Sequence, residues 1–484
     1  MKKSFIPFIL ILTLNLNAQS LDVRIQDSLT LSPIPFSTVS FSNNKGLISD
    51  EDGMFELVKN ELFNQDSLFV SSLGYQKASF ALNEFKDSIV FLLPKPVLLE
   101  DVILTSKRLT SKEIIEEVIR NLEKNYETGL TKNKVFLSKK SNSKTQRFNI
   151  SKFKSSIKEI NLSLLDSISN NLSKENNFSL EVLCYQFGNI EEENQKINLI
   201  KARETYSKDD EILESLNDRL ELYLKENIKS DSYFKIKSRL FGADMTIDGL
   251  HEMDSTSTDF ISKKNKEDLE RKNNFAGNQK NTINNIYSNL FFNEDSNFDF
   301  ILKPKKYSFS EPELNFIGDD LVYIIECTPK GGSKYKGTLY INSDDFAVIR
   351  LDFKNIKPLF KFKLLGVSYN RYLREGKILL SKFDNKKYNL SYAQIASNQT
   401  FSIDRPIRLI EKNKNVKGRR KQNEISFKMD MVINQEYKTE IQVFESSTIS
   451  MDEFEKLEEK NKVLPRNNQV DVTYSCIGVE YKFI

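Results

Sequence analysis

The sequence predicts a mixed, mainly β protein, with an N-terminal β-sandwich, an α/β middle region and a C-terminal curved antiparallel β-sheet. Short runs of alternating apolar and polar residues, separated by turn residues, fill positions 21–105. Helical and strand patterns then mix, and longer alternating runs joined by hairpin-type turns follow them. At 484 residues the chain is too long for one ordinary core. We expect a signal peptide over 1–18, the sandwich over 19–106, the mixed region over 107–295 and the curved sheet over 296–484.

The first residues have the pattern of an export signal. Lys2 and Lys3 precede the apolar run Phe5–Leu16, and Ala18 supplies a small residue for cleavage before Gln19. This apolar core is shorter than the ~20 residues that a membrane-spanning helix needs. No later stretch of the sequence is long and apolar enough to be such a helix. We therefore expect the mature protein to lie outside the cytoplasm, with no transmembrane helix.

Composition argues against several classes of function. The 71 basic and 68 acidic side chains leave a formal net charge of only +3, so no global field favours nucleic acid. The three cysteines, Cys184, Cys327 and Cys476, are far apart and odd in number, which fits neither a disulfide framework nor a zinc site. At most one disulfide can form among them, and the sequence leaves their pairing open.

The sandwich is predicted from short strands at regular spacing. Pro33 and Pro35 suit an edge or a turn, because proline cannot donate a ladder hydrogen bond. The run Asp50–Gly53 is a tight turn in which Gly53 adopts positive φ without steric cost. The expected strands are Leu21–Gln26, Phe36–Ser42, Met54–Val58, Ser67–Ser72, Lys77–Leu82, Ser88–Leu93 and Leu99–Thr105.

Four segments carry a resemblance to a known family: SPIPFSTVSF, LISDEDGMFEL, DSLFVSSLGYQKASFAL and the exit strand LLEDVIL. Their order and spacing over residues 21–105 resemble the carboxypeptidase D regulatory-like domain of exported Bacteroidetes proteins. The resemblance implies a transthyretin-like sandwich, a module that accompanies zinc peptidases and many unrelated partners. It also implies a location in the periplasm or at the outer-membrane periphery of a Gram-negative bacterium.

The peptidase itself is not expected. A zinc carboxypeptidase needs two histidines and a carboxylate as ligands, whereas His251 is the single histidine of this chain. Asp50, Glu51 and Asp52 form a carboxylate cluster of the kind that binds calcium. A solvated hairpin turn is the favoured interpretation of that cluster, because aspartate and glycine are common turn residues.

The middle region begins with a helix signal. Thr110 and Glu113 have capping-box spacing ahead of the apolar stripe Ile114, Ile115 and Val118. The run SKEIIEEVIRNLEKNY resembles a segment that follows the same sandwich in longer proteins of this kind. Beyond it we expect strands at Val135–Lys139 and Tyr233–Leu240, and helices at Ile157–Ser169, Lys196–Lys225 and Lys266–Leu290.

Two further polar groups have a functional and a plain interpretation. His251 lies near Asp248, Glu252 and Asp254, a combination that can hold a metal but more often lies in a surface loop. A basic run suits phosphate or anionic lipid headgroups, although a long solvated hairpin loop is the simpler interpretation. The basic residues are Lys412, Lys414, Lys417, Arg419, Arg420 and Lys421.

The C-terminal part reads as consecutive hairpins in a curved sheet. Gly331-Gly332 and Arg374-Glu375-Gly376 are the predicted hairpin connections. The run YKGTLYINSDDFAVIRLDF resembles the curved half-barrel of lipoprotein carriers, in which the sheet cups an acyl chain. The expected strands are Phe298–Leu302, Asp320–Cys327, Tyr335–Asn342, Phe346–Phe353, Phe360–Tyr372, Lys377–Asp384, Lys387–Ala396, Gln399–Ile410 and Ile425–Phe444.

The sequence contains no Gly-x-Ser-x-Gly elbow, phosphate-binding glycine loop or Cys-x-x-Cys pair. The leading hypothesis is therefore a non-enzymatic cell-envelope binding or interaction protein, with no cofactor and no metal. The alternative is a periplasmic carrier of a lipid or another apolar ligand. An outer-membrane-associated protein or an unrecognised enzyme ranks third. The carrier hypothesis predicts an apolar ligand cup lined by Phe346, Val348, Phe360, Phe362 and Leu364.

Overall fold

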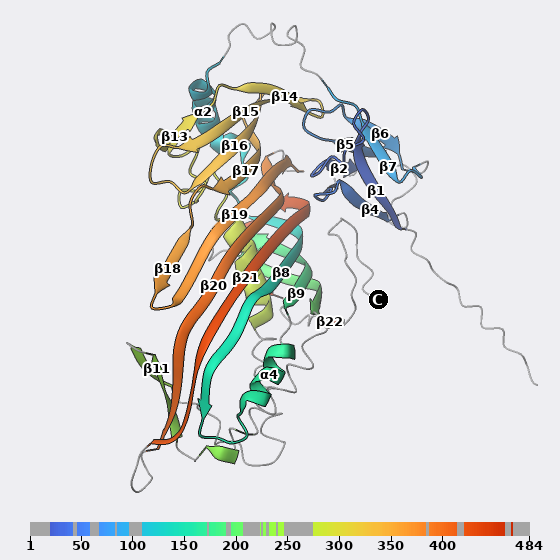
Figure 1. The fold of residues 1–484 in the computed structure, drawn as a ribbon. Helices are drawn as coiled ribbons and strands as arrows, with labels where there is room; N and C mark the ends of the chain where they lie inside the picture. The colour runs from blue at the N-terminus through green and yellow to red at the C-terminus, as the bar shows by residue number, and fades with distance from the viewer. Residues whose placement is uncertain are drawn as a thin grey trace, which may run out of the picture. The chain divides into compact units, whose positions relative to one another are not determined.

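The computed structural model divides the chain into two compact units. The first holds residues 20–95 and Phe316–Asp319, and the second holds most of the remainder. Figure 1 labels their helices and strands. The residues that the structure describes are 20–41, 46–58, 67–82, 85–95, 109–171, 174–189, 195–206, 223, 226–228, 232–238, 241–245, 274–383, 387–413, 421–459 and 466–467.

The first unit is a β-sandwich, as predicted. A three-stranded sheet of order β4-β1-β7 faces a four-stranded sheet of order β3-β2-β5-β6. Alternate side chains from both sheets, among them Val23, Phe55 and Val70, are fully buried in one core. The strands are β1 (Ser20–Asp27), β2 (Thr38–Phe41), β3 (Gly46–Ile48), β4 (Met54–Val58), β5 (Ser67–Ser71), β6 (Ala78–Ala81) and β7 (Ile89–Leu92).

Six of the seven predicted strands match these elements, and the seventh, Leu99–Thr105, lies outside the described residues. The turn at Asp50 is also present. Its carboxylate Oδ1 accepts hydrogen bonds from the backbone N–H groups of Asp52, at 2.9 Å, and Met54, at 2.8 Å. Gly53 follows with φ of +72°. The Asp50 carboxylate thus closes the turn before β4.

The second unit begins with the predicted helix. α2 (Ser111–Arg120) has the expected capping box, in which Thr110 accepts from the Glu113 backbone and Glu113 accepts from the Thr110 backbone. Its stripe of Ile114, Ile115 and Val118 is buried. α3 (Leu122–Asn125) follows, and α4 (Leu162–Asn171) and α7 (Met451–Lys456) are also short.

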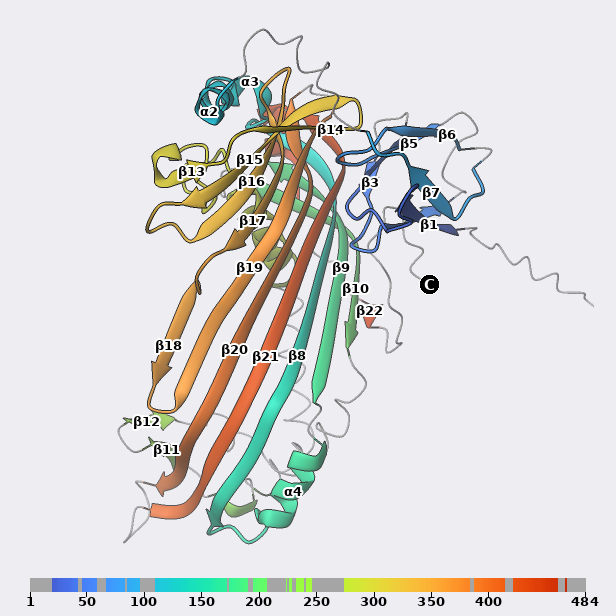
Figure 2. The ribbon, with the colours of Figure 1, turned by 45° about the horizontal axis from the view of Figure 1, so that its top comes forward.

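One large sheet holds the rest of the second unit. It contains fifteen strands among the described residues and is antiparallel except where β22 pairs with β10. Figure 2 shows β19, β20, β21 and β8 side by side as long curved strands. The strands are β8 (Thr131–Ser155), β9 (Glu175–Gly188), β10 (Gln195–Tyr206), β11 (Ser232–Ser238), β12 (Phe241–Met245), β13 (Tyr307–Phe309), β14 (Glu313–Ile317), β15 (Asp320–Pro329), β16 (Tyr335–Asn342), β17 (Val348–Asn355), β18 (Phe360–Leu364), β19 (Val367–Lys382), β20 (Tyr388–Asn413), β21 (Lys421–Thr448) and β22 (Arg466–Asn467).

The fold class is therefore the predicted one, and the large sheet crosses residue 295, the expected border between two regions. Strands β8, β9 and β10 precede that residue. β8 pairs with β21, β9 pairs with β8, and β10 pairs with β9. A helix over residues 274–287 packs on one face of the sheet. Its Phe275, Ile283 and Ile286 share a core with Leu137 of β8 and Ile441 of β21. This main core covers only part of the sheet.

Several predicted element borders are wrong. Residues 298–302 form turns and not the predicted strand. Phe298 and Phe300 alternate as strand residues do, but both rings are buried in the main core from an irregular segment. Residues 196–206 belong to β10, since Ile197 and Leu199 bury against the core at strand spacing. The predicted strands Lys387–Ala396 and Gln399–Ile410 are one continuous strand, β20.

The predicted turn at Arg374-Glu375-Gly376 lies inside β19. Gly376 allows β19 and β20 to lie close together there, because a Cβ at this position would lie 2.1 Å from the carbonyl oxygen of Gln394. The turn between β18 and β19 is formed by Leu365 and Gly366, with φ of +50° and +80°. The Gly331-Gly332 connection between β15 and β16 is confirmed.

Candidate functional site

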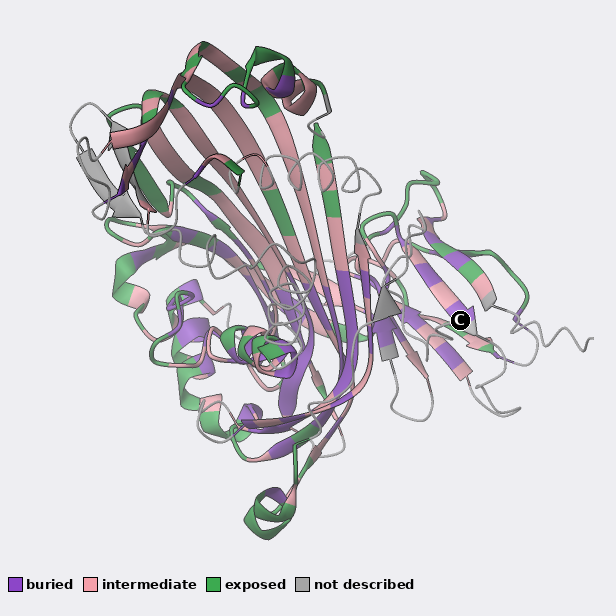
Figure 3. Cartoon of the chain, turned by 90° about the horizontal axis from the view of Figure 1, so that it is seen from below, coloured by how far each residue is buried: buried purple, intermediate pink, exposed green. Residues whose placement is uncertain are grey.

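Three strands of the large sheet extend well beyond the main core. β8, β20 and β21 contain 25, 26 and 28 residues, so each is roughly 80–90 Å long at the usual rise per residue. Figure 3 shows long strands of the sheet that are buried over one part of their length and only half-buried over the rest. We call this half-buried part the distal section. It comprises residues 145–155 of β8, 367–371 of β19, 397–409 of β20 and 425–437 of β21, together with β18.

One face of the distal section carries a concentration of apolar side chains. Phe401 lies opposite Ile433, and Ile403 opposite Met431, and the register of β20 on β21 is unbroken from Tyr392 to Ile410. Because side chains alternate between faces, all odd-numbered positions of these two strands share one face. We call its apolar residues the apolar band: Phe148, Ile150, Phe360, Phe362, Leu364, Val367, Phe401, Ile403, Ile407, Met429, Met431 and Ile433.

The opposite face of the same strands is polar and ion-paired. Lys428 contacts Asp404 at 2.8 Å, and Arg147 contacts Asp430 at 2.8 Å. The Thr400 hydroxyl donates to Asn434 Oδ1 at 2.8 Å. Charged and amide side chains of this kind are typical of a solvent-exposed surface. The distal section therefore has one face suited to water and one that is not.

The apolar band lies between two packed regions. Ala393, Ile441 and Leu137 on the same face belong to the main core. Beyond the band, Leu409, Ile425 and Phe427 pack in a small core with Ile157 and Ile160 of the segment after β8. Every band residue is half-exposed or exposed, and Phe360, Phe362 and Leu364 keep 54%, 41% and 47% of their surface in contact with solvent. Apolar surface is concentrated here rather than scattered.

A row of hydrogen-bonded polar side chains separates the band from the main core. Tyr369 donates to Gln399 Oε1 at 2.5 Å, and the Gln399 amide donates to Gln435 Oε1 at 2.7 Å. Tyr437 completes the row, and partial burial beside Tyr369 raises its pKa. This polar row, Tyr369, Gln399, Gln435 and Tyr437, crosses three strands. It gives the apolar band a polar border on the side of the main core.

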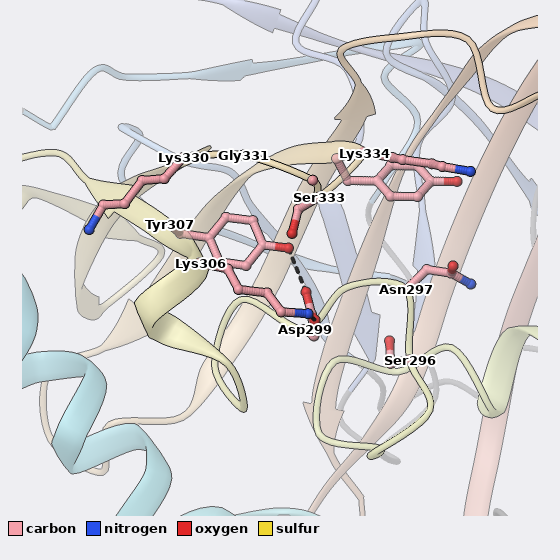
Figure 4. A pocket seen from close by; sticks show the side chains of 11 residues that line it. Ser296, Asn297, Asp299, Lys306, Tyr307, Lys330, Gly331, Ser333 and Lys334 are labelled. Carbon is pink, nitrogen blue, oxygen red and sulfur yellow. Dashed lines mark hydrogen bonds and ion pairs between the residues drawn. The ribbon is translucent and has the colours of Figure 1, made fainter.

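A second candidate site is a pocket of about 560 Å³ at the other end of the unit, between residues 296–307 and the β15–β16 connection. Figure 4 shows the Tyr307 hydroxyl directed at Asp299 with Lys306 beside them, and Lys330 and Lys334 also line the pocket. Gly331 and Gly332 also line it, and a Cβ added to either glycine would meet no atom within 4 Å.

The Asp299 carboxylate is fully engaged within this pocket. Its Oδ1 accepts a hydrogen bond from the Tyr307 hydroxyl at 2.5 Å, and its Oδ2 accepts from Lys306 at 2.8 Å. Lys303 lies 3.8 Å from Oδ2. These partners outweigh the cost of burial and lower the pKa of Asp299, while burial and Asp299 raise the pKa of Tyr307. The pair is built to hold the segment 299–307 in place, not to exchange protons near neutral pH.

The structure separates the five residues of the predicted cup into two groups. Val348 is fully buried in the main core, and Phe346 packs against that core and stacks on Tyr323 with ring centroids 6.4 Å apart. Phe360, Phe362 and Leu364 lie on β18 and belong to the apolar band. The sequence prediction missed the β8, β20 and β21 members of the band, although their alternation is visible in FSIDRPIRLI and ISFKMDMVI.

Other predicted groups add little. His251 and residues 414–420 of the basic run lie outside the described residues. Cys184 and Cys327 are buried free thiols, and Cys476 is outside the described range. In the described ranges no three or more His, Cys, Asp or Glu residues are grouped to hold a metal ion. None of the described helices has the length and hydropathy required to cross a bilayer.

No protein-family model matches this sequence, and neither does any curated protein. Function must therefore be inferred from the chain's own geometry.

Proposed function

We propose that this chain is a non-enzymatic binding protein of the cell envelope, and that its apolar band holds the hydrocarbon chain of an amphiphile. The observation that carries this proposal is the division of the distal section into an apolar face and an ion-paired face. A sheet exposed to water on both faces gains nothing from twelve apolar residues on one of them. A ligand that covers this face supplies the missing burial.

The dimensions of the band suit an acyl chain. From Phe401 to Ile407 the band extends over six residue spacings of β20, or ~20 Å. The hydrocarbon part of one membrane leaflet is ~15 Å thick. Across the band, five neighbouring strands span ~19 Å. Aliphatic and methionine side chains form most of this surface, and methionine adapts to ligands of varied shape.

Export and the first unit fit the same proposal. The signal-like residues 1–18 direct the chain to the periplasm or to the outer-membrane periphery of a Gram-negative bacterium. The sandwich is a carboxypeptidase D regulatory-like domain that acts as an interaction or spacer module. Its support is the motif order over residues 21–105 and the seven-stranded sandwich. Cell fractionation with a periplasmic and an outer-membrane marker tests the location.

A pair of neighbouring substitutions tests the binding proposal. Phe401→Asp places a carboxylate within the apolar band, and Thr400→Asp places the same group one residue away on the opposite face. We expect Phe401→Asp to weaken binding of a fluorescent C16 acyl probe at least about tenfold, because a carboxylate is costly to cover with hydrocarbon. Thr400→Asp should bind as the wild type does.

Thermal unfolding of both variants controls for loss of the fold. Equal weakening by two folded variants would contradict the proposal, and so would a wild-type protein that does not bind the probe.

A further inference from the structure

Arg405 is a cation in the middle of the apolar band. It lies on β20 between Ile403 and Ile407, and the β-sheet register places it directly opposite Met429 of β21. On the far side of Met429 lies Ile150 of β8. Its Nε is buried and has no hydrogen-bond partner among the described residues. The aliphatic part of the Arg405 side chain is thus flanked by Ile403 and Ile407 on its own strand and by Met429 on β21.

Two nearby arginines lie on the opposite face and are paired. Arg408 forms two contacts with the Glu424 carboxylate, and Arg147 contacts Asp430. Asp404 precedes Arg405 in the chain, but it lies on the opposite face and pairs with Lys428. On the apolar face of the distal section, as far as the structure describes it, the charged residues are Arg371 and Arg405, with no carboxylate beside them.

The positive charge of Arg405 favours an anionic partner. A guanidinium group in a protein carries a fixed positive charge. Covering an unpaired cation with hydrocarbon is unfavourable, so a purely apolar ligand would be opposed at Arg405. A carboxylate or phosphate group, in contrast, matches the planar fork of the guanidinium with two parallel hydrogen bonds.

We infer that the ligand is an anionic acyl amphiphile, and that Arg405 binds its carboxylate or phosphate while the hydrocarbon chain lies on the neighbouring apolar band. This inference rests on the proposed function, because it takes the band as the binding surface. Arg405 contributes specificity for charge, and the surrounding band contributes affinity for the chain. Arg371 lies next to the polar row, where its Nη2 is 3.5 Å from the Tyr369 hydroxyl, and it adds to the positive potential of the same face.

Ligands that share one chain length but differ in headgroup test the inference. The affinity of the full mature chain is measured by displacement of the fluorescent C16 probe with palmitate, palmitoyl lysophosphatidic acid, hexadecanol and palmitoyl lysophosphatidylcholine. Acetate and inorganic phosphate are added alone to test for binding of a free anion. We expect the two anionic lipids to bind about 10- to 100-fold more tightly than hexadecanol, because only they form charge-assisted hydrogen bonds with the guanidinium of Arg405. The free anions should not displace the probe.

Two substitutions at Arg405 and one control complete the test. Arg405→Met keeps the stem and removes the charge, so anionic lipids should bind only as well as hexadecanol, whose affinity should not fall. Arg405→Lys should keep part of the preference. Arg408→Met, three residues along the same strand on the opposite face, should leave the preference unchanged.

The outcomes separate the inference from the proposed function. If the probe binds and Phe401→Asp weakens it, but charged and uncharged lipids bind equally, the band is a binding surface and the role of Arg405 is wrong. If the probe does not bind at all, the proposed function itself fails. If lysophosphatidylcholine is preferred over the anionic lipids, the inferred charge is wrong. Thermal unfolding of Arg405→Met confirms that each comparison is made on folded protein.

Discussion

Phe401 of β20 lies directly opposite Ile433 of β21, while the preceding residue Thr400 hydrogen-bonds to Asn434 on the other face of the same two strands. This one-residue alternation separates a polar, ion-paired face of the distal section from the face that carries the apolar band. A shift of one residue in register would exchange the two faces. The register of these long strands thus places the candidate ligand surface.

Gly376 is a sensitive point of the large sheet. A Cβ added there would lie 2.1 Å from the Gln394 carbonyl oxygen and 2.9 Å from the Phe353 ring. We expect Gly376→Ala to lower the free energy of unfolding by about 1–3 kcal/mol through overpacking, as measured by urea denaturation. Gly331→Ala, where a Cβ meets open space, should change it by less than about 0.5 kcal/mol. Equal effects of the two substitutions would contradict this packing.

Tyr126 ties the segment after α3 to the start of β17. Its fully buried hydroxyl accepts from the Val348 N–H at 2.5 Å and lies 3.2 Å from the Val348 carbonyl oxygen. Tyr126→Phe leaves that buried backbone N–H without its partner, so we expect a loss of about 1–3 kcal/mol in unfolding free energy. Tyr372→Phe, at a side chain 39% exposed, is the matched control and should be near neutral. A neutral Tyr126→Phe would show that water replaces the hydroxyl.

Asp299 should stabilise the fold in a pH-dependent way. Its pKa is lower in the folded protein than its ordinary value of 3.8, so the folded state binds the proton less readily than the unfolded state. The stabilisation is therefore complete above pH 3.8 and is lost as the pH falls through the folded pKa. We expect Asp299→Asn to be less stable than the wild type by about 1.5–3 kcal/mol at pH 7. Chemical denaturation from pH 7 to pH 2.5 should show that difference shrinking, and a constant difference would contradict the charge argument.

Lys139 should make the stability of the fold depend on pH in the alkaline range. It lies at the edge of the main core and donates to Gln279 Oε1 at 2.8 Å, and burial lowers its pKa to about 8 from 10.5. Between these two pH values the unfolded state binds more protons, so the stability contribution of Lys139 rises with pH. We expect the wild type to gain stability relative to Lys139→Met between pH 8 and about 10, measured by denaturation of both proteins. Parallel pH profiles would show that Lys139 remains solvated.

Local chemistry made several of these elements predictable from sequence. The capping box of Thr110 and Glu113 defines the start of α2, and the short alternating runs of the sandwich define six of its strands. Each of these signals acts over a few neighbouring residues. The alternation of Phe360, Phe362 and Leu364 likewise indicated an apolar face.

The face on which distant strands meet is set by register, which short-range patterns do not contain. Val348 alternates like the band residues but points into the main core, so its inclusion in the predicted cup does not follow from alternation alone. The Asp299 pocket was not predicted. Phe298 and Phe300 have the alternating pattern of a strand, whereas the backbone forms turns at these residues. Its signal was the pair Asp299 and Lys306, whose meeting depends on that turn.

Photocrosslinking locates the hydrocarbon chain of a bound ligand on the protein. Palmitate with a diazirine near its methyl end is bound to the full mature chain, irradiated, and the labelled residues are identified by peptide mass spectrometry. We expect labels on the apolar band, above all at Phe401, Ile403 and Met431, and loss of the labels with excess unlabelled palmitate. Labels confined to the sandwich, to the Asp299 pocket or to the polar face around Lys428 would contradict it.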